Sequence, residues 1–232
     1  MFIGHFGLAF AARRIAPRTG LGTLGAASQW VDLVWPVLVL AGVEQVRIAP
    51  GDTAYTPLAF VHYPWTHSLL MSLAWALLVG LAYRLATGER RGAWVVGALV
   101  ASHWVLDFLT HRPDLPVVPW GVERYGLGLW NHVAATVVVE GLIFAGGVLL
   151  YATGTRPRRR AGSIVLWALV AFLVAMTAAN QLSTPPGESA VAWGTLSMWL
   201  LVAWMAWVDR LRQPAGLAAM STVSAAGERG VP

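Results

Sequence analysis

The chain has 232 residues, of which 57% are hydrophobic and only 12% charged, with a formal net charge of +5. A soluble domain carries about twice that share of charged residues, so the composition excludes an ordinary soluble fold and favours a helical membrane protein. There is no cysteine, which excludes disulfides, thiolate zinc sites and a cysteine nucleophile. Most arginines flank apolar stretches, so orientation in a membrane explains the positive charge better than nucleic-acid binding.

The first part of the chain predicts one short helix and one span. Residues 2–12 are apolar apart from His5 and are too few to cross a bilayer, which predicts a short or re-entrant helix. Residues 21–43 are long enough for a span, and Pro36 should kink it. The segment 44–64 is rich in turn-forming residues and reads as a loop.

Five further apolar stretches each approach or exceed the length of about 20 residues that crosses a bilayer. They cover residues 68–85, 92–110, 127–152, 162–181 and 190–208. We therefore expect an all-α, polytopic helical membrane bundle of about six spans plus the short N-terminal helix. Residues 1–212 should form one membrane-embedded domain, with the site in 1–152 and two accessory spans in 161–212. Residues 213–232 should form a disordered tail.

The arginines predict the orientation of the bundle. They cluster in alternate connections, at residues 13–18, 84–91, 156–160 and 210–212. Because positive charge stays on the cytoplasmic side, the intervening connections should face away from the cytoplasm. These are 44–65, 112–126 and 182–189. The sequence thus predicts a multi-pass protein of the inner or plasma membrane.

One apolar stretch contains an unusual polar face. His103, Asp107 and His111 are spaced four residues apart, so they share one side of a helix. A carboxylate inside a membrane costs at least about 2.5 kcal/mol, and something must offset that cost. Imidazole and carboxylate together suit zinc, manganese or iron, which suggests a metal site.

Helical rise places other polar residues at the same depth. At about 1.5 Å per residue from the cytoplasmic arginines, His103 lies about 18 Å up and Asp107 about 24 Å up. Similar reasoning brings eight residues into the non-cytoplasmic half of the bundle: His5, Asp32, His67, His103, Asp107, His111, His132 and Glu140. We expect a divalent metal there, zinc first and manganese or iron as alternatives.

Roles can be assigned within this set. The expected metal ligands are His5, Asp32, His67, His103 and Asp107. Glu140 and His111 are the candidate catalytic residues, with Glu140 either a general base or a partner that orients a histidine.

Several of these residues also have structural interpretations. His111 could simply end its helix, where a cation suits the helix dipole. His132 could be an interfacial hydrogen-bonding residue, and His62 could be an interfacial residue of the loop 44–64. Asp32 and Glu140 could instead hydrogen-bond across helices as protonated acids.

Four short motifs resemble a known family. They are Gly4-His5-Phe6, Trp30-Val31-Asp32-Leu33, Thr66-His67-Ser68 and Ser102-His103-Trp104-Val105-Leu106-Asp107. They resemble the predicted membrane-bound metal-dependent hydrolases of the LexA-regulated inner-membrane type, described as distantly similar to zinc-dependent phospholipase C. By this resemblance, Asp32 and His67 bind one zinc with Asp107 as a bridge, and His5 and His103 complete the cluster.

The resemblance covers about residues 1–152 and has a limit. The phospholipase pattern has a later histidine and glutamate one helical turn apart, whereas His132 and Glu140 are two turns apart here. His111 also follows Asp107 more closely than the third histidine of that pattern does. The likeness therefore does not extend to a third metal.

The leading functional hypothesis is a metal-dependent hydrolase of a phosphoester or lipid-linked substrate at the non-cytoplasmic face. Its expected partners are the bilayer and a lipid or phosphoester substrate, without nucleic acid. The alternative is a non-enzymatic transporter or ion relay that uses the same cluster, although the cytoplasmic half offers no polar residues to continue a path. A third interpretation is that the polar residues only hold helices together.

Overall fold

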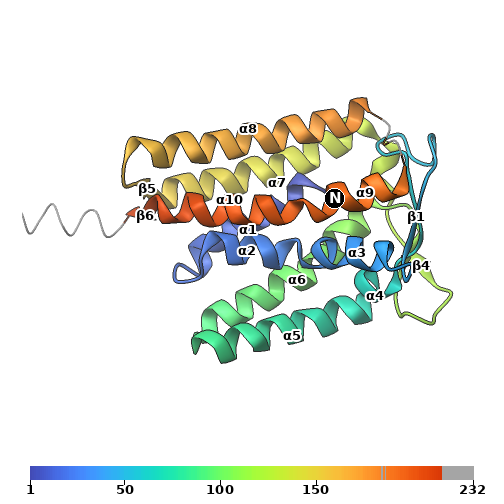
Figure 1. Cartoon of the computed structure of the whole chain (residues 1–232), viewed down its shortest axis with the longest axis horizontal. Coiled ribbons are helices and arrows are strands. Elements are labelled where there is room, and N and C mark those ends of the chain that lie inside the picture. The colour runs from blue at the N-terminus through green and yellow to red at the C-terminus, as the bar shows by residue number, and fades with distance from the viewer. Residues whose placement is uncertain (184, 186, 216–232) are drawn as a thin grey trace, which may run out of the picture.

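The computed structural model describes residues 1–183, 185 and 187–215. Its helices run side by side along one long axis, with small strand pairs at both ends of the bundle (Figure 1). The first half comprises α1 (Ile3–Ile15), α2 (Leu21–Ser28), α3 (Trp30–Leu40), β1 (Gln45–Ile48), β2 (Leu58–His62), α4 (Pro64–His67), α5 (Leu69–Thr87) and α6 (Arg90–Thr110). The second comprises β3 (Leu115–Pro116), β4 (Arg124–Tyr125), η1 (Leu129–Asn131), α7 (Val133–Gly154), β5 (Thr155–Pro157), α8 (Arg160–Leu182), α9 (Glu188–Leu196), α10 (Met198–Arg210) and β6 (Arg212–Pro214).

The expected all-α membrane bundle is confirmed. Within the described residues, five helical segments are long and apolar enough to cross a membrane, with α9 and α10 together forming one of them. The pair α2–α3 makes a sixth if it is counted as one bent span. The helix α1 has 13 residues, which agrees with the short N-terminal helix expected from the sequence.

The break in the predicted span 21–43 lies not at Pro36 but at Gln29, which the sequence analysis did not predict. There α2 and α3 meet at an angle of 55°. Gln29 leaves the helical region with a ψ of 9°, whereas Pro36 lies inside the continuous helix α3. Proline removes only one backbone hydrogen bond, and a helix packed among other helices tolerates that loss.

The predicted loop 44–64 contains an antiparallel pair that the sequence analysis missed. Strand β1 pairs with β2, and Val46 is the buried residue of β1. Four residues give too short an alternation to separate a strand from a turn-rich loop. We call the end of the bundle that carries β1–β4 the hairpin end, and the opposite end, where β5 pairs with β6, the arginine-rich end (Figure 1).

The last predicted span is also interrupted. Ser197 separates α9 from α10, and β6 extends two residues into the segment expected to be a disordered tail. Arg212 anchors that strand: it is 6% exposed and donates to the carbonyl oxygen of Thr155 at 3.1 Å. Residues 216–232 lie outside the described part of the chain.

Close packing holds α1 inside the bundle. It crosses α7 where Gly7 meets Gly147, and a Cβ atom at Gly7 would lie 2.6 Å from the carbonyl oxygen of Ile143. Small residues allow such a backbone approach between membrane helices. Phe6 and Phe10 are fully buried beside it. This packing brings the first turn of α1 to the hairpin end of the bundle.

Candidate metal centre

The structure brings together all five residues predicted as metal ligands. His5 comes from α1, Asp32 from α3, His67 from α4, and His103 and Asp107 from α6. The three histidines and Asp107 are at most 4% exposed, and Asp32 is 21% exposed. Four elements far apart in the sequence therefore place ionisable groups in one small, nearly dry volume at the hairpin end.

Four of these residues face one another at distances that suit a metal. The Nε2 atom of His67 lies 3.2 Å from Asp32 Oδ1 and 3.8 Å from Asp107 Oδ2. The Nε2 atom of His103 lies 3.5 Å from Asp32 Oδ2 and 3.2 Å from Asp107 Oδ2. Metal–ligand bonds of about 2.0–2.2 Å in a tetrahedron separate neighbouring ligand atoms by about 3.4 Å. Each of these four distances is compatible with a shared ion, and the sets whose ligand atoms all lie within 4.8 Å of one another contain three residues each.

The backbone fixes the tautomer of His103. Its Nδ1 atom lies 2.8 Å from the carbonyl oxygen of Ser28. A carbonyl can only accept, so Nδ1 carries the proton and donates it. The lone pair of a neutral ring is then on Nε2, which is buried without a described hydrogen-bond partner and faces the two carboxylates.

A side-chain relay fixes His67 in the same way. The Thr66 hydroxyl donates to Glu44 Oε2 at 2.7 Å, so its oxygen accepts from His67 Nδ1, also at 2.7 Å. Glu44 is 1% exposed and also accepts from the backbone N–H groups of Trp65 and Thr66. The lone pair of His67 therefore lies on Nε2 and faces Asp32.

His5 has a different environment. Its Nε2 atom lies 3.1 Å from Asp107 Oδ1, to which it donates if that carboxylate is ionised. The same oxygen accepts from the amino group of Met1 at 2.6 Å. The His5 ring stacks on His103 with centroids 3.7 Å apart. His5 therefore touches Asp107 on the oxygen that faces away from His67 and His103.

Two overlapping groups could hold an ion. One is His5, His103 and Asp107, and the other is Asp32, His67 and His103. Because Nδ1 of His103 is bound to Ser28, both groups draw on the single lone pair of Nε2. One lone pair binds one metal, so the two groups are alternatives at His103.

The two candidate catalytic residues lie at the edge of this cluster. His111 ends α6, is 2% exposed and places Nε2 4.0 Å from Asp107 Oδ2. Glu140 is buried, and its Oε2 atom accepts from the backbone N–H groups of Phe2 at 2.8 Å and Gly4 at 3.4 Å. Its carboxylate thus occupies the N-terminal end of α1, where a negative charge is favourable.

The two remaining histidines lie outside the cluster. His132 is exposed at the start of α7, and His62 is exposed at the end of β2.

Asp114 was missed by the sequence analysis and anchors His111. Its Oδ1 accepts from His111 Nδ1 at 3.0 Å and from the Tyr63 hydroxyl at 2.7 Å, while Oδ2 accepts from Arg112 Nε at 3.3 Å. Burial alone would raise the pKa of Asp114, but these donors outweigh it and lower the pKa. Three histidines of the site therefore have Nδ1 held by a fixed acceptor.

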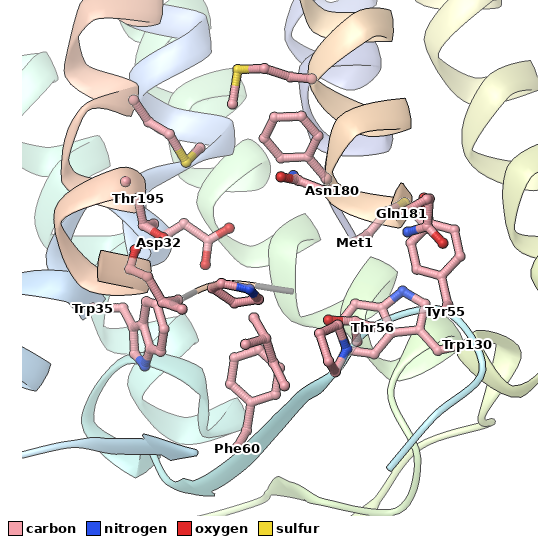
Figure 2. A pocket seen from close by; sticks show the side chains of 18 of the residues that line it. Met1, Asp32, Trp35, Tyr55, Thr56, Phe60, Trp130, Asn180, Gln181 and Thr195 are labelled. Carbon is pink, nitrogen blue, oxygen red and sulfur yellow. Dashed lines mark hydrogen bonds between the residues drawn. The ribbon is translucent and has the colours of Figure 1, made fainter. Parts of the chain in front are cut away.

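A cavity of about 400 Å³ opens beside the cluster (Figure 2). Asp32, His67, Asp107 and His111 line its polar floor. Trp35, Phe60, Tyr55 and Trp130 line the side toward the hairpins. Asn180, Gln181 and Thr195 come from the spans predicted to be accessory, so α8 and α9 are part of the wall of the site.

The sequence model of the YdjM inner membrane protein family matches residues 9–204. The chain belongs to this family. The match spans Asp32, His67, His103 and Asp107, and together with the apolar helices it establishes a multi-pass inner-membrane protein. The family description names no reaction. Comparison with curated proteins and with solved structures finds no match.

Proposed function

We propose that this member of the YdjM family is an integral-membrane, metal-dependent hydrolase that acts on a phosphoester, carried by a lipid or lipid-linked molecule. One observation carries the proposal: two histidines with Nδ1 fixed aim Nε2 lone pairs at two carboxylates across 3.2–3.8 Å. Lone pairs that face each other at these distances in a largely buried site repel, which favours a cation between them.

A metal satisfies this arrangement better than protons. Protonating both rings would need two charged imidazoles in one buried volume, where each charge is costly. One divalent ion can instead meet Asp32, His67 and His103 at once, and Asp107 Oδ2 lies 3.2 Å from His103 Nε2 and 3.8 Å from His67 Nε2 as a fourth ligand. Nitrogen and oxygen ligands in a four-fold set favour zinc, and manganese or iron are the alternatives.

The chemistry follows from what surrounds these ligands. A metal held by these residues would lower the pKa of a coordinated water to about 7 and so supply a nucleophile. Hydrolysis of a phosphoester would then form a P–O bond to water, break the P–O bond to the alcohol and need one proton for that alcohol. His111 lines the cavity with Nε2 toward Asp107 and Nδ1 held by Asp114, so it is placed to carry this proton.

Other residues position this machinery. We assign His5 the role of a donor that orients Asp107 and Glu140 that of a cap that holds α1 in place. Second-sphere contacts of this kind usually tune metal affinity by 10–100-fold.

Two further arguments support the substrate class and the side of the membrane. The His and Asp motifs resemble those of zinc-dependent phospholipase C, which favours a phosphoester. The arginine-rich end carries the orientation signals, and under the positive-inside rule this favours a cavity on the non-cytoplasmic side.

The test is metal analysis of the purified protein combined with an assay on bis(p-nitrophenyl) phosphate. We expect about one zinc per chain, and hydrolysis that a chelator abolishes and zinc restores. Protein that is folded but holds no zinc, manganese or iron near stoichiometry would refute the proposal.

A further inference from the structure

Away from the metal cluster, the cavity lies between α8 on one side and α9 with the start of α10 on the other. One wall comes from the end of α8 and the other from α9 and the start of α10, through Met176, Asn180, Gln181, Gly194, Thr195 and Met198. In Figure 2 the Asp32 carboxylate and the Asn180 amide point into the cavity from opposite sides. The cavity therefore offers uncharged hydrogen-bonding groups beside the acidic cluster, and two methionines farther from the hairpins.

Charge restricts what can bind there. Among the described residues that line the cavity, none is a lysine or an arginine. The amino group of Met1 is already paired with Asp107 at 2.6 Å. A divalent ion and the Met1 ammonium, set against Asp32 and Asp107, would leave one net positive charge for an anionic ligand. A singly charged phosphodiester neutralises that charge, whereas a doubly charged monoester or a diphosphate leaves excess negative charge in a site without lysine or arginine.

The apolar part favours a hydrocarbon chain. Met176 and Met198 have flexible, polarisable side chains that adapt to irregular ligands. Both belong to membrane-spanning segments, so a chain that enters from the bilayer stays in an apolar environment. The cavity volume of about 400 Å³ lies near the lower end of typical ligand sites, which suits a headgroup with part of one chain.

We propose that this cavity binds one chain of a membrane amphiphile whose headgroup is joined through a phosphodiester. The phosphate lies beside Asp32 and Asp107, the headgroup meets the amides of Asn180 and Gln181, and the chain passes between Met176 and Met198. The identity of the reacting bond rests on the proposed hydrolase function, but binding is measurable without it.

Gly194 offers a way to block the cavity without disturbing the protein. It lines the cavity on α9, and a Cβ atom there would meet no described atom within 4 Å. A Gly194→Leu side chain should therefore extend into the space of the ligand. Gly146 in α7 is a matched control, since a Cβ atom there also meets nothing described within 4 Å and the residue does not line the cavity.

The experiment uses the full chain in lipid nanodiscs and a dodecylphosphocholine that carries a diazirine in its alkyl chain. After irradiation, peptide mass spectrometry should map the label to residues 173–182 and 191–198. Gly194→Leu should lower this labelling about tenfold, and Gly146→Leu should leave it unchanged. Asn180→Leu, on the opposite wall, should lower it as well and serves if Gly194→Leu fails to fold.

Competition tests the charge argument. Unlabelled dodecylphosphocholine should compete about tenfold better than dodecyl phosphate, which carries a second negative charge. Label spread evenly over the lipid-facing helices in wild type and both glycine variants would overturn the proposal. Equal competition by the two amphiphiles would overturn its diester specificity.

Metal content and diester hydrolysis are measured on the same proteins, so the two proposals can fail separately. Labelling confined to the cavity in a protein without metal or hydrolysis would uphold the binding site and refute the hydrolase. If the protein held metal and hydrolysed the diester but the label spread evenly over the helices, only the binding-site proposal would be refuted.

Discussion

Two carboxylates, one near each end of the bundle, have different surroundings: Asp107 is buried and Asp209 is partly buried. At the arginine-rich end, Asp209 of α10 accepts from Arg13 Nε at 3.2 Å, the backbone N–H of Leu21 at 3.2 Å and the Tyr151 hydroxyl at 3.3 Å. Every described partner of Asp209 is a donor, and one of them is a cation. This network links α10 to α1, α2 and α7, and both Asp209 oxygens accept hydrogen bonds from residues of the chain.

The cluster at the hairpin end is complete only on one side. Asp107 Oδ1 accepts from Met1 and His5, but Oδ2 faces Nε2 atoms whose rings already donate from Nδ1. Each carboxylate therefore has one cationic partner, but only Asp107 has a second oxygen that faces histidine nitrogens instead of donors. The comparison separates a carboxylate whose described partners all donate to it from one that is assigned to a metal site in the proposed function.

The largest effect is expected when the same substitution is made at both ends. Asp107→Asn should weaken metal binding by more than about 100-fold, since it removes a proposed ligand rather than a second-sphere contact. Asp209→Asn should keep full metal content but lower the free energy of unfolding by about 3 kcal/mol, because Arg13 loses its counter-charge. Elemental analysis and unfolding in SDS titrations measure the two quantities. Equal metal content in both variants would remove the distinction between the clusters.

Removal of the metal from wild type should reveal the same difference between the two ends. With zinc at about 1,000 times its dissociation constant, binding adds about 4 kcal/mol to the free energy of unfolding. Chelation should therefore lower the melting temperature of wild type and of Asp209→Asn, and leave Asp107→Asn unchanged. If neither chelator nor zinc changed the melting temperature of wild type, the cluster would have a purely structural role.

The relay behind His67 should produce a smaller loss. Thr66→Val preserves the shape of the side chain but removes the hydroxyl that accepts from His67 Nδ1 and donates to Glu44. The ring then loses its fixed tautomer, and metal affinity should fall by about 10–100-fold.

Thr136→Val is the control for this change, because its buried hydroxyl donates to the carbonyl oxygens of Leu129 and His132 instead. It should leave metal affinity unchanged. Similar affinities in the two threonine variants would show that the relay does not position His67.

Asp114 gives a pH-dependent prediction. Asp114→Asn should cost about 1 kcal/mol at neutral pH, because the ionised carboxylate accepts from His111, Tyr63 and Arg112. Its pKa in the folded protein is below the ordinary value of 3.8, so this contribution is complete above pH 3.8. It disappears as the pH falls through the lowered pKa. Wild type and variant should thus differ equally in unfolding titrations from pH 7 to pH 4 and converge below that range.

Much of the fold, and the proximity of the candidate ligands, could be predicted from local features of the sequence. Long apolar stretches predict spans because the thickness of the bilayer fixes their length. The placement of the arginines then predicts which end of each span faces the cytoplasm. Depth along each helix brings Asp32, His67, His103 and Asp107 to one level, and the structure groups His103 with Asp32 and His67 on one side and with His5 and Asp107 on the other.

Other features depend on contacts that no local pattern reveals. Glu44 has the sequence context of an ordinary loop residue, yet it is buried and accepts from the backbone N–H groups of Trp65 and Thr66. The pairing of β1, which follows Glu44, with β2, which precedes α4, brings these residues together. The bend at Gln29 and the cavity wall from α8 and α9 likewise arise from packing between distant helices. Residue spacing gives height in the membrane but not which helices are neighbours.

The smallest effect is expected at the two histidines that the fold leaves outside. His62→Ala and His132→Ala should each change the free energy of unfolding by less than about 0.5 kcal/mol, because both side chains are exposed. Neither belongs to a group of residues placed to hold an ion, so metal content should stay at the wild-type level. His103→Ala, in contrast, removes the only lone pair common to both possible ion groups. If His132→Ala lost metal as His103→Ala does, ligation would have to involve a rearranged α7, and the contrast between anchored and exposed histidines would not hold.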